Sequence, residues 1–246
     1  MTVRADPQDQ ARLLDLQALD TRTQQIAHAK RTLPQTAELA QIASALDTLR
    51  RRTAGESGTL DDLRTELRRI ESDVAVVTTR LARDSARLQS TASSKDAQGL
   101  EHEIASLNRR QSDLEDMQLG VMERVEEQEA VLAGLETERT VLADRQAALT
   151  ADRDAAVATL DAEEADVVAR RAALVATLPE DLVALYEKQR SRYGIGAALL
   201  RRGVSGGSNV ALTGSDLATI RSTPADVVVL DPESGCILVR TEESGL

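Results

Sequence analysis

A long heptad repeat between residues 39 and 88 limits what this chain can fold into. Apolar side chains recur there at alternating steps of three and four residues: Leu39, Ile42, Leu46, Leu49, Leu60, Leu63, Leu67, Ile70, Val74, Val77, Leu81 and Leu88. The register continues through the polar positions Thr53, Glu56 and Asp84. A repeat of this length predicts one helix whose narrow apolar seam has to pack against a partner helix.

A second apolar repeat follows and supplies that partner. Its members are Leu100, Ile104, Leu107, Leu114, Val121, Val125, Leu132, Leu135, Leu142, Leu149, Leu160, Val167 and Leu174. Between the two repeats lies the polar stretch 89–94, and Ser93 and Asp96 have the spacing of a helix capping box. An antiparallel hairpin is favoured because the turn is short and the arms match in length. A parallel dimer is the alternative.

Prolines mark further breaks. Asp6 followed by Pro7 predicts a helix start. Pro34 coincides with a slip in the apolar register, so we expect a kink near residues 32–36. Pro179 ends the second arm and begins a short helix.

Three domains are predicted. They are an antiparallel coiled-coil hairpin over 1–178 with its tip near 90–96, a linker helix and basic joint over 179–203, and a small module over 204–246. The tip consists of Ser93, Ser94, Lys95 and Asp96. The basic joint contains Lys188, Arg190, Arg192, Arg201 and Arg202 with no acid among them, and it is interpreted either as a solvated linker or as a contact for an acidic partner or a nucleic acid.

The last forty residues lose the helical periodicity. Glycines separate short β-prone runs at 209–212, 227–230 and 237–240, and a short helix is expected near 215–221. The fold class is therefore mainly α: a long antiparallel coiled-coil hairpin with a small C-terminal β-rich, zinc-ribbon-like module.

Two tight turns in the module, 205–208 and 231–234, have the spacing of zinc knuckles, and we call them the knuckle turns. Their end positions are Ser205, Ser208, Asp231 and Ser234. Structural zinc requires thiolate or imidazole ligands, and hydroxyls are poor substitutes. The single cysteine, Cys236, does not restore such a site. We therefore expect no metal and no cofactor.

The chain resembles the bacterial family of coiled-coil hairpin proteins that end in a C4-type zinc ribbon, a domain of unknown function, in its actinobacterial branch. The resemblance rests on the twin heptad arms, the tip at 94–96 with Leu100, Glu103 and Ile104, residues 185–190, the knuckle turns, the helix at 217–220 and residues 237–240. It implies zinc cysteines at the positions of Ser205, Ser208, Asp231 and Ser234, which are lost here. It also implies an adaptor or scaffold role, with protein or nucleic-acid contact at the ribbon end and no enzymatic activity.

A module of forty residues without metal or disulfide is near the lower size limit for independent folding. We expect it to dock on the linker helix or the rod through Ile220, Val227, Val229, Ile237 and Val239.

Composition excludes several functions. The chain has 246 residues, a formal net charge of −11, no Phe or Trp and two Tyr, which disfavours general nucleic-acid binding and leaves few stacking side chains. The two histidines, His28 and His102, are far apart in sequence. No phosphate loop or nucleophile motif is found. An enzyme is not expected, and no catalytic residue is assigned.

A non-enzymatic scaffold or adaptor for unidentified protein partners is the favoured function. The alternative is a nucleic-acid-binding regulatory factor that uses the basic joint and the ribbon end. The N-terminus lacks a signal peptide and no apolar run is long enough to span a bilayer, so we expect a cytoplasmic protein without membrane contact. A monomer is slightly favoured.

Overall fold

The computed structural model describes residues 3–246 and shows a mainly helical chain with one small sheet. The elements in chain order are α1 (Pro7–Arg31), α2 (Pro34–Ser90), α3 (Ser94–Val175), α4 (Glu180–Tyr193), β1 (Ala197–Arg201), β2 (Val204–Ser205), α5 (Gly214–Ser222), β3 (Val229–Leu230), β4 (Ile237–Val239) and the 3₁₀ turn η1 (Glu242–Ser244). These elements form two compact units, residues 1–34 with 152–246 and residues 35–151.

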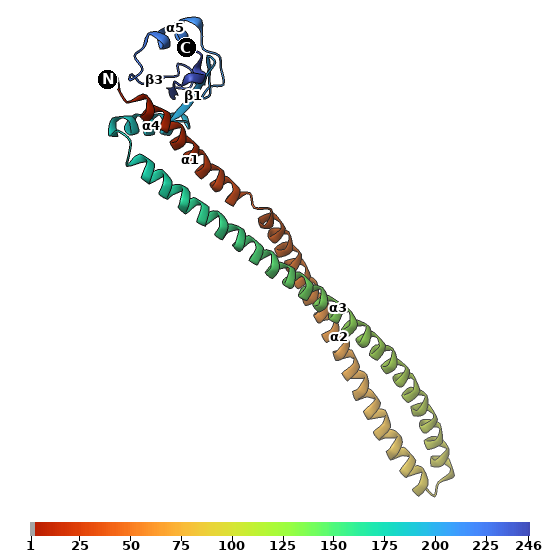
Figure 1. The fold of residues 1–246 in the computed structure, drawn as a ribbon. Coiled ribbons are helices and arrows are strands. Elements are labelled where there is room, and N and C mark those ends of the chain that lie inside the picture. The colour runs from red at the N-terminus through yellow and green to blue at the C-terminus, as the bar shows by residue number, and fades with distance from the viewer. Residues whose placement is uncertain (1–2) are drawn as a thin grey trace. The chain divides into compact units, whose positions relative to one another are not determined.

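The unit of residues 35–151 is a hairpin in which α2 and the first part of α3 lie side by side (Figure 1). The heptad positions supply its buried side chains, which are Ile42, Leu49, Leu60, Leu63, Ile70, Leu114, Val121 and Leu135. Ile70 packs with Leu114 and Val121 in one apolar cluster. The prediction of a hairpin within one chain is confirmed.

Polar contacts between the two arms show their antiparallel order. Near the turn Arg80 pairs with Glu103, farther along Arg64 pairs with Glu129 at 2.7 Å, and farther still Arg145 lies 3.4 Å from Glu38. Residue numbers on α3 therefore rise as those of their partners on α2 fall, which is the order of an antiparallel pair. At the turn itself, the Asp96 N–H donates to Ser93 Oγ at 3.4 Å, so Ser93 caps the start of α3.

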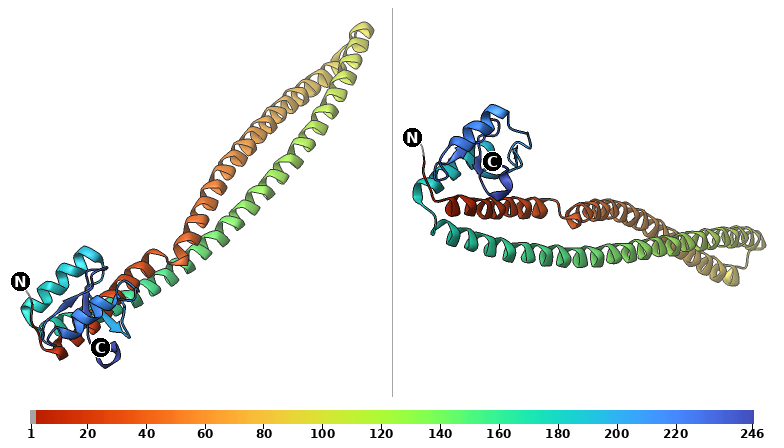
Figure 2. Two further views of the ribbon diagram at one scale, coloured as in Figure 1. Left: turned by 90° about the horizontal axis from the view of Figure 1, so that it is seen from above. Right: turned by 45° about the horizontal axis from the view of Figure 1, so that its top comes forward.

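The other unit joins α1, the C-terminal part of α3, α4 and the sheet; Figure 2 gives two further views of these elements. The side chain of Asp6 accepts a hydrogen bond of 2.8 Å from the Gln8 N–H and caps α1, as the Asp6–Pro7 pair predicts. One core contains side chains from α1, α4, the strands and the turn before α4: Leu13, Leu16, Leu178, Leu182, Tyr186, Ala197, Ile237 and Val239.

The sheet has the strand order β2-β1-β4-β3, with β1 parallel to β4 and the other pairs antiparallel. Ala197 lies opposite Ile237 in the parallel pair. Arg202 and Gly203 connect β1 to β2 with φ of 49° and 76°, the two positive values that a tight type I′ turn requires.

The strand predicted at 209–212 is wrong, because that segment makes only an isolated bridge between Ala211 and Val204. The central strand is β1, which the sequence places in the basic joint. Its apolar run is only four residues long, and so short a run does not identify a strand without knowledge of its partner. The helix expected near 215–221 is confirmed as α5.

Docking of the module is confirmed for two of the predicted residues. Ile237 and Val239 are fully buried in the core shared with α1 and α4. Ile220 and Val229 instead belong to a second cluster inside the module, with Leu200 and Leu238, so their assignment to docking is wrong. Val227 forms a bridge with Arg4, and the adjacent Val228 N–H donates to Val3 O at 3.1 Å.

Candidate interaction site

The four knuckle positions lie together in the module. The carboxylate of Asp231 is at the centre, where Oδ2 accepts hydrogen bonds from Ser205 Oγ at 2.6 Å and from Ser234 Oγ at 2.5 Å. Ser205 is fully buried and Asp231 is nearly so. The first turn is therefore connected to the second through one carboxylate.

Backbone N–H groups fix the two buried oxygens. Ser205 Oγ accepts from Gly207 N at 3.1 Å and from Ser208 N at 3.4 Å, and Asp231 Oδ1 accepts from Glu233 N at 3.1 Å. Each turn thus holds the side chain of its first residue inward by bonds to its own backbone.

Burial alone would raise the pKa of Asp231, but hydrogen bonds from Ser205, Ser234, the Glu233 N–H and Ser208 outweigh burial and lower that pKa below its ordinary value. The group is an anion at neutral pH. The donor set of one carboxylate and three neutral hydroxyls does not fit zinc, which requires thiolate or imidazole ligands. Within residues 3–246 no group of three His, Cys, Asp or Glu side chains is arranged to hold a metal ion.

Two glycines allow close packing around this cluster. A Cβ atom at Gly207 would lie 2.4 Å from Cys236 Sγ, and a Cβ atom at Gly235 would lie 2.4 Å from the Tyr193 ring. Gly235 also has a φ of +70°, which other residues rarely adopt. Burial raises the pKa of the Cys236 thiol, so this thiol is poorly suited to react as a thiolate.

The residues of the basic joint do not form one surface. Arg190 is half-buried and lies 2.8 Å from Glu187 and 3.4 Å from Asp20. Arg201 is exposed and pairs with Glu243 at 3.1 Å. The acids that pair with these two arginines lie on α1, α4 and η1. Asp20 and Glu243 are outside the joint, so the sequence of the joint alone does not predict these pairs.

The joint has three further exposed cations: Lys188, Arg192 and Arg202. Within residues 3–246 none of the three makes an ion pair. The guanidinium of Arg192 lies over the Tyr193 ring at 5.2 Å from the centroid. These three residues are the part of the joint that is available to an anionic partner.

A buried ionic network joins α1, α3 and α4, and the sequence interpretation did not identify it. Asp20 is 4% exposed and accepts from Arg171 Nε at 2.7 Å and from the Tyr186 hydroxyl at 2.7 Å. Gln17 Oε1 accepts from the Gly196 N–H at 2.7 Å, which ties α1 to the residue preceding β1. The available signal was the heptad position of Asp20, which follows Leu13 and Leu16 at steps of three and four.

The tip residues Ser93, Ser94, Lys95 and Asp96 are all exposed at the turn between α2 and α3. The hydroxyl of Ser93 caps α3. Within the described residues, the side chains of the tip make no ion pair. Their role as a contact site stays a prediction.

A different surface on α3 carries exposed apolar side chains among acids. Leu119 is 60% exposed and Met122 is 41% exposed, while their neighbours Leu114 and Val121 fill the seam toward α2. Steps of four, three and four residues place Glu115, Leu119, Met122 and Glu126 on one side of the helix. We call these four residues the α3 stripe.

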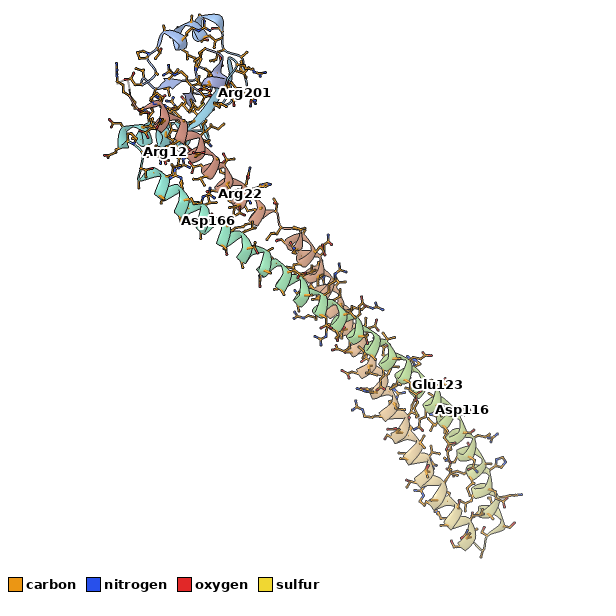
Figure 3. The ribbon with its side chains drawn as sticks, viewed as in Figure 1. Arg12, Arg22, Asp116, Glu123, Asp166 and Arg201 are labelled. Atoms are coloured by element: carbon orange, nitrogen blue, oxygen red, sulfur yellow. The ribbon has the colours of Figure 1, made fainter. Side chains whose placement is uncertain are left out.

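The surroundings of the α3 stripe are acidic. Figure 3 labels two of these acids, Asp116 and Glu123, on this part of α3. Five acids in and around the stripe form no ion pair with any residue in the range 3–246: Asp113, Asp116, Glu123, Glu126 and Glu127. Arg124, the single cation between residues 113 and 129, pairs with Glu66 of α2 at 3.6 Å.

The two histidines belong to different units of the chain. His28 lies on α1 in one unit and His102 on α3 in the other. Among the helices of residues 3–246, none is both long and apolar enough to cross a membrane.

Comparisons with known proteins place these features in a wider group. The profile of the CT398-like coiled coil hairpin domain matches residues 16–194. The uncharacterised protein Rv2229c of Mycobacterium tuberculosis is 36% identical over 245 residues, which cover 98% of each chain.

Solved structures agree in fold. A protein from Mycobacterium smegmatis aligns with a TM-score of 0.86 and 32% identity, over 97% of this chain and 100% of that chain. CT398 from Chlamydia trachomatis aligns with a TM-score of 0.65 and 17% identity, over 94% of this chain and 97% of that chain.

Proposed function

We propose that this chain, which belongs to the family of CT398-like coiled coil hairpin proteins, is a non-enzymatic scaffold that binds protein partners. The observation that carries the proposal is the α3 stripe, where two large apolar side chains are exposed among acids that no residue in the range 3–246 neutralises. A long hairpin satisfies its own seam, so apolar side chains on its outside gain from burial only when another molecule covers them.

The charge around the stripe selects the kind of partner. We infer that the partner supplies a basic amphipathic helix, whose apolar side chains cover Leu119 and Met122 and whose Lys or Arg side chains approach the surrounding acids. Helices of this kind are recognised through apolar residues at steps of three and four. Exposed charges attract across solvent at low ionic strength and are screened by salt.

Crosslinking in the native cells, followed by purification of the full-length chain, tests this proposal. We expect crosslinks from residues 113–127 to a basic amphipathic segment of a partner, and we expect the Leu119→Lys, Met122→Lys double variant to lose them. Val141→Lys is the matched control, because Val141 is 62% exposed on the same helix outside the acidic stretch. Equal loss in the control, or crosslinks unchanged in the double variant, would contradict the proposed surface.

Nucleic-acid binding through the basic joint is the alternative, and Arg190 and Arg201 support it poorly because both are paired with acids. A salt-sensitive shift of RNA or DNA by the chain would favour this alternative if replacing Lys188, Arg192 and Arg202 together by Gln abolishes it.

A further inference from the structure

We propose that the Asp231 carboxylate has, in this chain, the structural role that a bound metal ion has in a module with knuckle-spaced ligands. The proposal concerns how the module is held together and does not depend on the scaffold function.

The carboxylate of Asp231 connects the two knuckle turns. The two knuckle turns are 26 residues apart in sequence, and Asp231 Oδ2 lies within 2.6 Å of a hydroxyl from each of them. One oxygen atom therefore connects Ser205 of the first turn with Ser234 of the second. A metal ion between two knuckles makes the same connection through its ligands.

Both turns keep the local geometry of a ligand loop. In each turn the side-chain oxygen of the first residue, Ser205 or Asp231, accepts from a backbone N–H two residues later. Gly207 leaves the space that Cys236 Sγ and Ser234 Oγ occupy, since a Cβ atom there would lie 2.4 Å and 2.7 Å from them. The centre is filled by protein atoms.

The side-chain donors to the Asp231 carboxylate are neutral hydroxyls. Ser205 and Ser234 use their hydroxyl protons to bind the carboxylate, as a charge-assisted hydrogen bond requires. A single carboxylate with neutral hydroxyls offers too few charged oxygens for calcium or magnesium and no soft ligand for zinc. The cluster is complete without a metal.

Apolar contacts with α1 and α4 keep the module folded although hydrogen bonds to Asp231 are a weaker tie than a metal. Ile237 and Val239 of β4 are fully buried in the core formed with α1 and α4. Apolar burial on helices outside the module supplies stability that a free-standing ribbon of this size lacks. The module consequently keeps its shape when metal is scarce.

The two tyrosines provide a specific probe for the test. Tyr186 is buried in the shared core and the ring of Tyr193 lies against Gly235 next to the second knuckle turn. The chain has no Phe or Trp, so the near-UV circular dichroism of the full-length protein reports on the surroundings of these two side chains.

The experiment follows this signal during heating. The wild type should show the same midpoint with EDTA and with added zinc chloride, and should retain no zinc after dialysis. Asp231→Asn should lower the midpoint by about 5 °C or more, and Ser234→Ala should lower it less. Asp226→Asn is the control, because Asp226 belongs to an exposed pair with Arg4. One zinc per wild-type chain whose removal abolishes the signal, or a wild-type midpoint in Asp231→Asn, would overturn the proposal.

A gain-of-function variant tests the geometry independently. Ser205→Cys, Ser208→Cys, Asp231→Cys and Ser234→Cys combined should bind one zinc per chain, and EDTA should then lower the midpoint of the tyrosine signal. A folded four-cysteine protein that binds no zinc would show that the turns lack ligand geometry, and would contradict the proposal. If this variant does not fold, the zinc content and midpoints of the wild type and Asp231→Asn still decide the proposal.

Discussion

The hydroxyl of Tyr186 donates a hydrogen bond of 2.7 Å to the buried carboxylate of Asp20, and this bond joins α4 to α1. Both groups are removed from water, and the same carboxylate also binds Arg171. Burial and the bond to Asp20 raise the pKa of Tyr186, so the phenol stays protonated and remains a donor. Together with the contact of Arg190 with the same carboxylate at 3.4 Å, this bond ties α4 to α1.

Replacing Tyr186 by Phe removes this donor and keeps the ring in the core. A hydrogen bond to a charged group contributes about 1.5–3 kcal/mol, so we expect Tyr186→Phe to lower the free energy of unfolding by about 2 kcal/mol. Circular dichroism during urea unfolding, or calorimetry during heating, measures this change in the free energy of unfolding. Tyr193→Phe is the control, since the hydroxyl of Tyr193 makes no hydrogen bond with the described residues and its side chain is half-exposed. Equal effects of the two variants would argue against a special role of the Asp20 bond.

The ionic network also predicts how stability depends on pH. Burial alone would raise the pKa of Asp20, but hydrogen bonds from Arg171 and Tyr186 outweigh burial and hold that pKa below its ordinary value of 3.8. A carboxyl whose folded pKa is lowered contributes stability that is present above its unfolded pKa and is lost as pH falls through the folded pKa.

We therefore compare Asp20→Asn with the wild type across pH. At pH 7 the variant leaves Arg171 and Arg190 without this anion, and we expect a loss of about 2–3 kcal/mol, less than for a fully buried pair because both cations are partly exposed. The difference from the wild type should stay constant down to about pH 5 and shrink below about pH 4. Tyrosine near-UV circular dichroism during urea unfolding gives both values. A difference that grows with acidification would contradict the assignment.

The heptad repeat was sufficient to predict the hairpin, because apolar residues at 3.5-residue spacing leave few ways to bury one seam. Ile70, Leu114 and Val121 occupy the positions that this periodicity assigns to the core. The sheet was harder to predict. Its central strand β1 pairs with β4 forty residues away in a parallel register, and local propensity carries no information on such a partner.

The candidate sites divide in the same way. Spacing alone predicted that the knuckle positions are set on matching turns, and Ser205 and Asp231 do meet. The pairing of Arg190 with Asp20 could not be foreseen, because it depends on how α1 and α4 pack after a separation of 170 residues in sequence. A run of basic residues shows charge, but the fold decides which of the charges remain accessible.

Asp84 gives a prediction for the hairpin unit. It occupies a seam position between Leu81 and Leu88, is 2% exposed, and its Oδ2 has no hydrogen-bond partner within the described chain. Arg83 and Arg80 approach it only at 3.4 Å and 3.9 Å. Since a buried acceptor without a partner costs about 1–3 kcal/mol, Asp84→Leu should stabilise the unit by about 1–2 kcal/mol. Far-UV circular dichroism during heating measures this change in stability.

Asp73→Leu is the control and should give no gain, because Asp73 is exposed on the same helix. A lower midpoint for Asp84→Leu would show that the two arginines hold Asp84 more strongly than the distances suggest.

Gly196 tests how closely the sheet approaches α4. A Cβ atom at this position would lie 2.4 Å from Cε2 of Tyr186, and the ring cannot move away because its hydroxyl is held by Asp20. Overpacking of this kind typically costs about 1–3 kcal/mol, so we expect Gly196→Ala to destabilise the unit by that amount and to shift the tyrosine near-UV signal. Gly214→Ala is the matched control, because a Cβ atom there meets nothing within 4 Å at the start of α5. The control should be neutral or slightly stabilising.

If Tyr186→Phe is combined with Gly196→Ala, the ring is released from Asp20 and can shift, so the double variant should lose less stability than the two single losses added together. Strict additivity would mean that the ring is held by the apolar core rather than by the bond to Asp20.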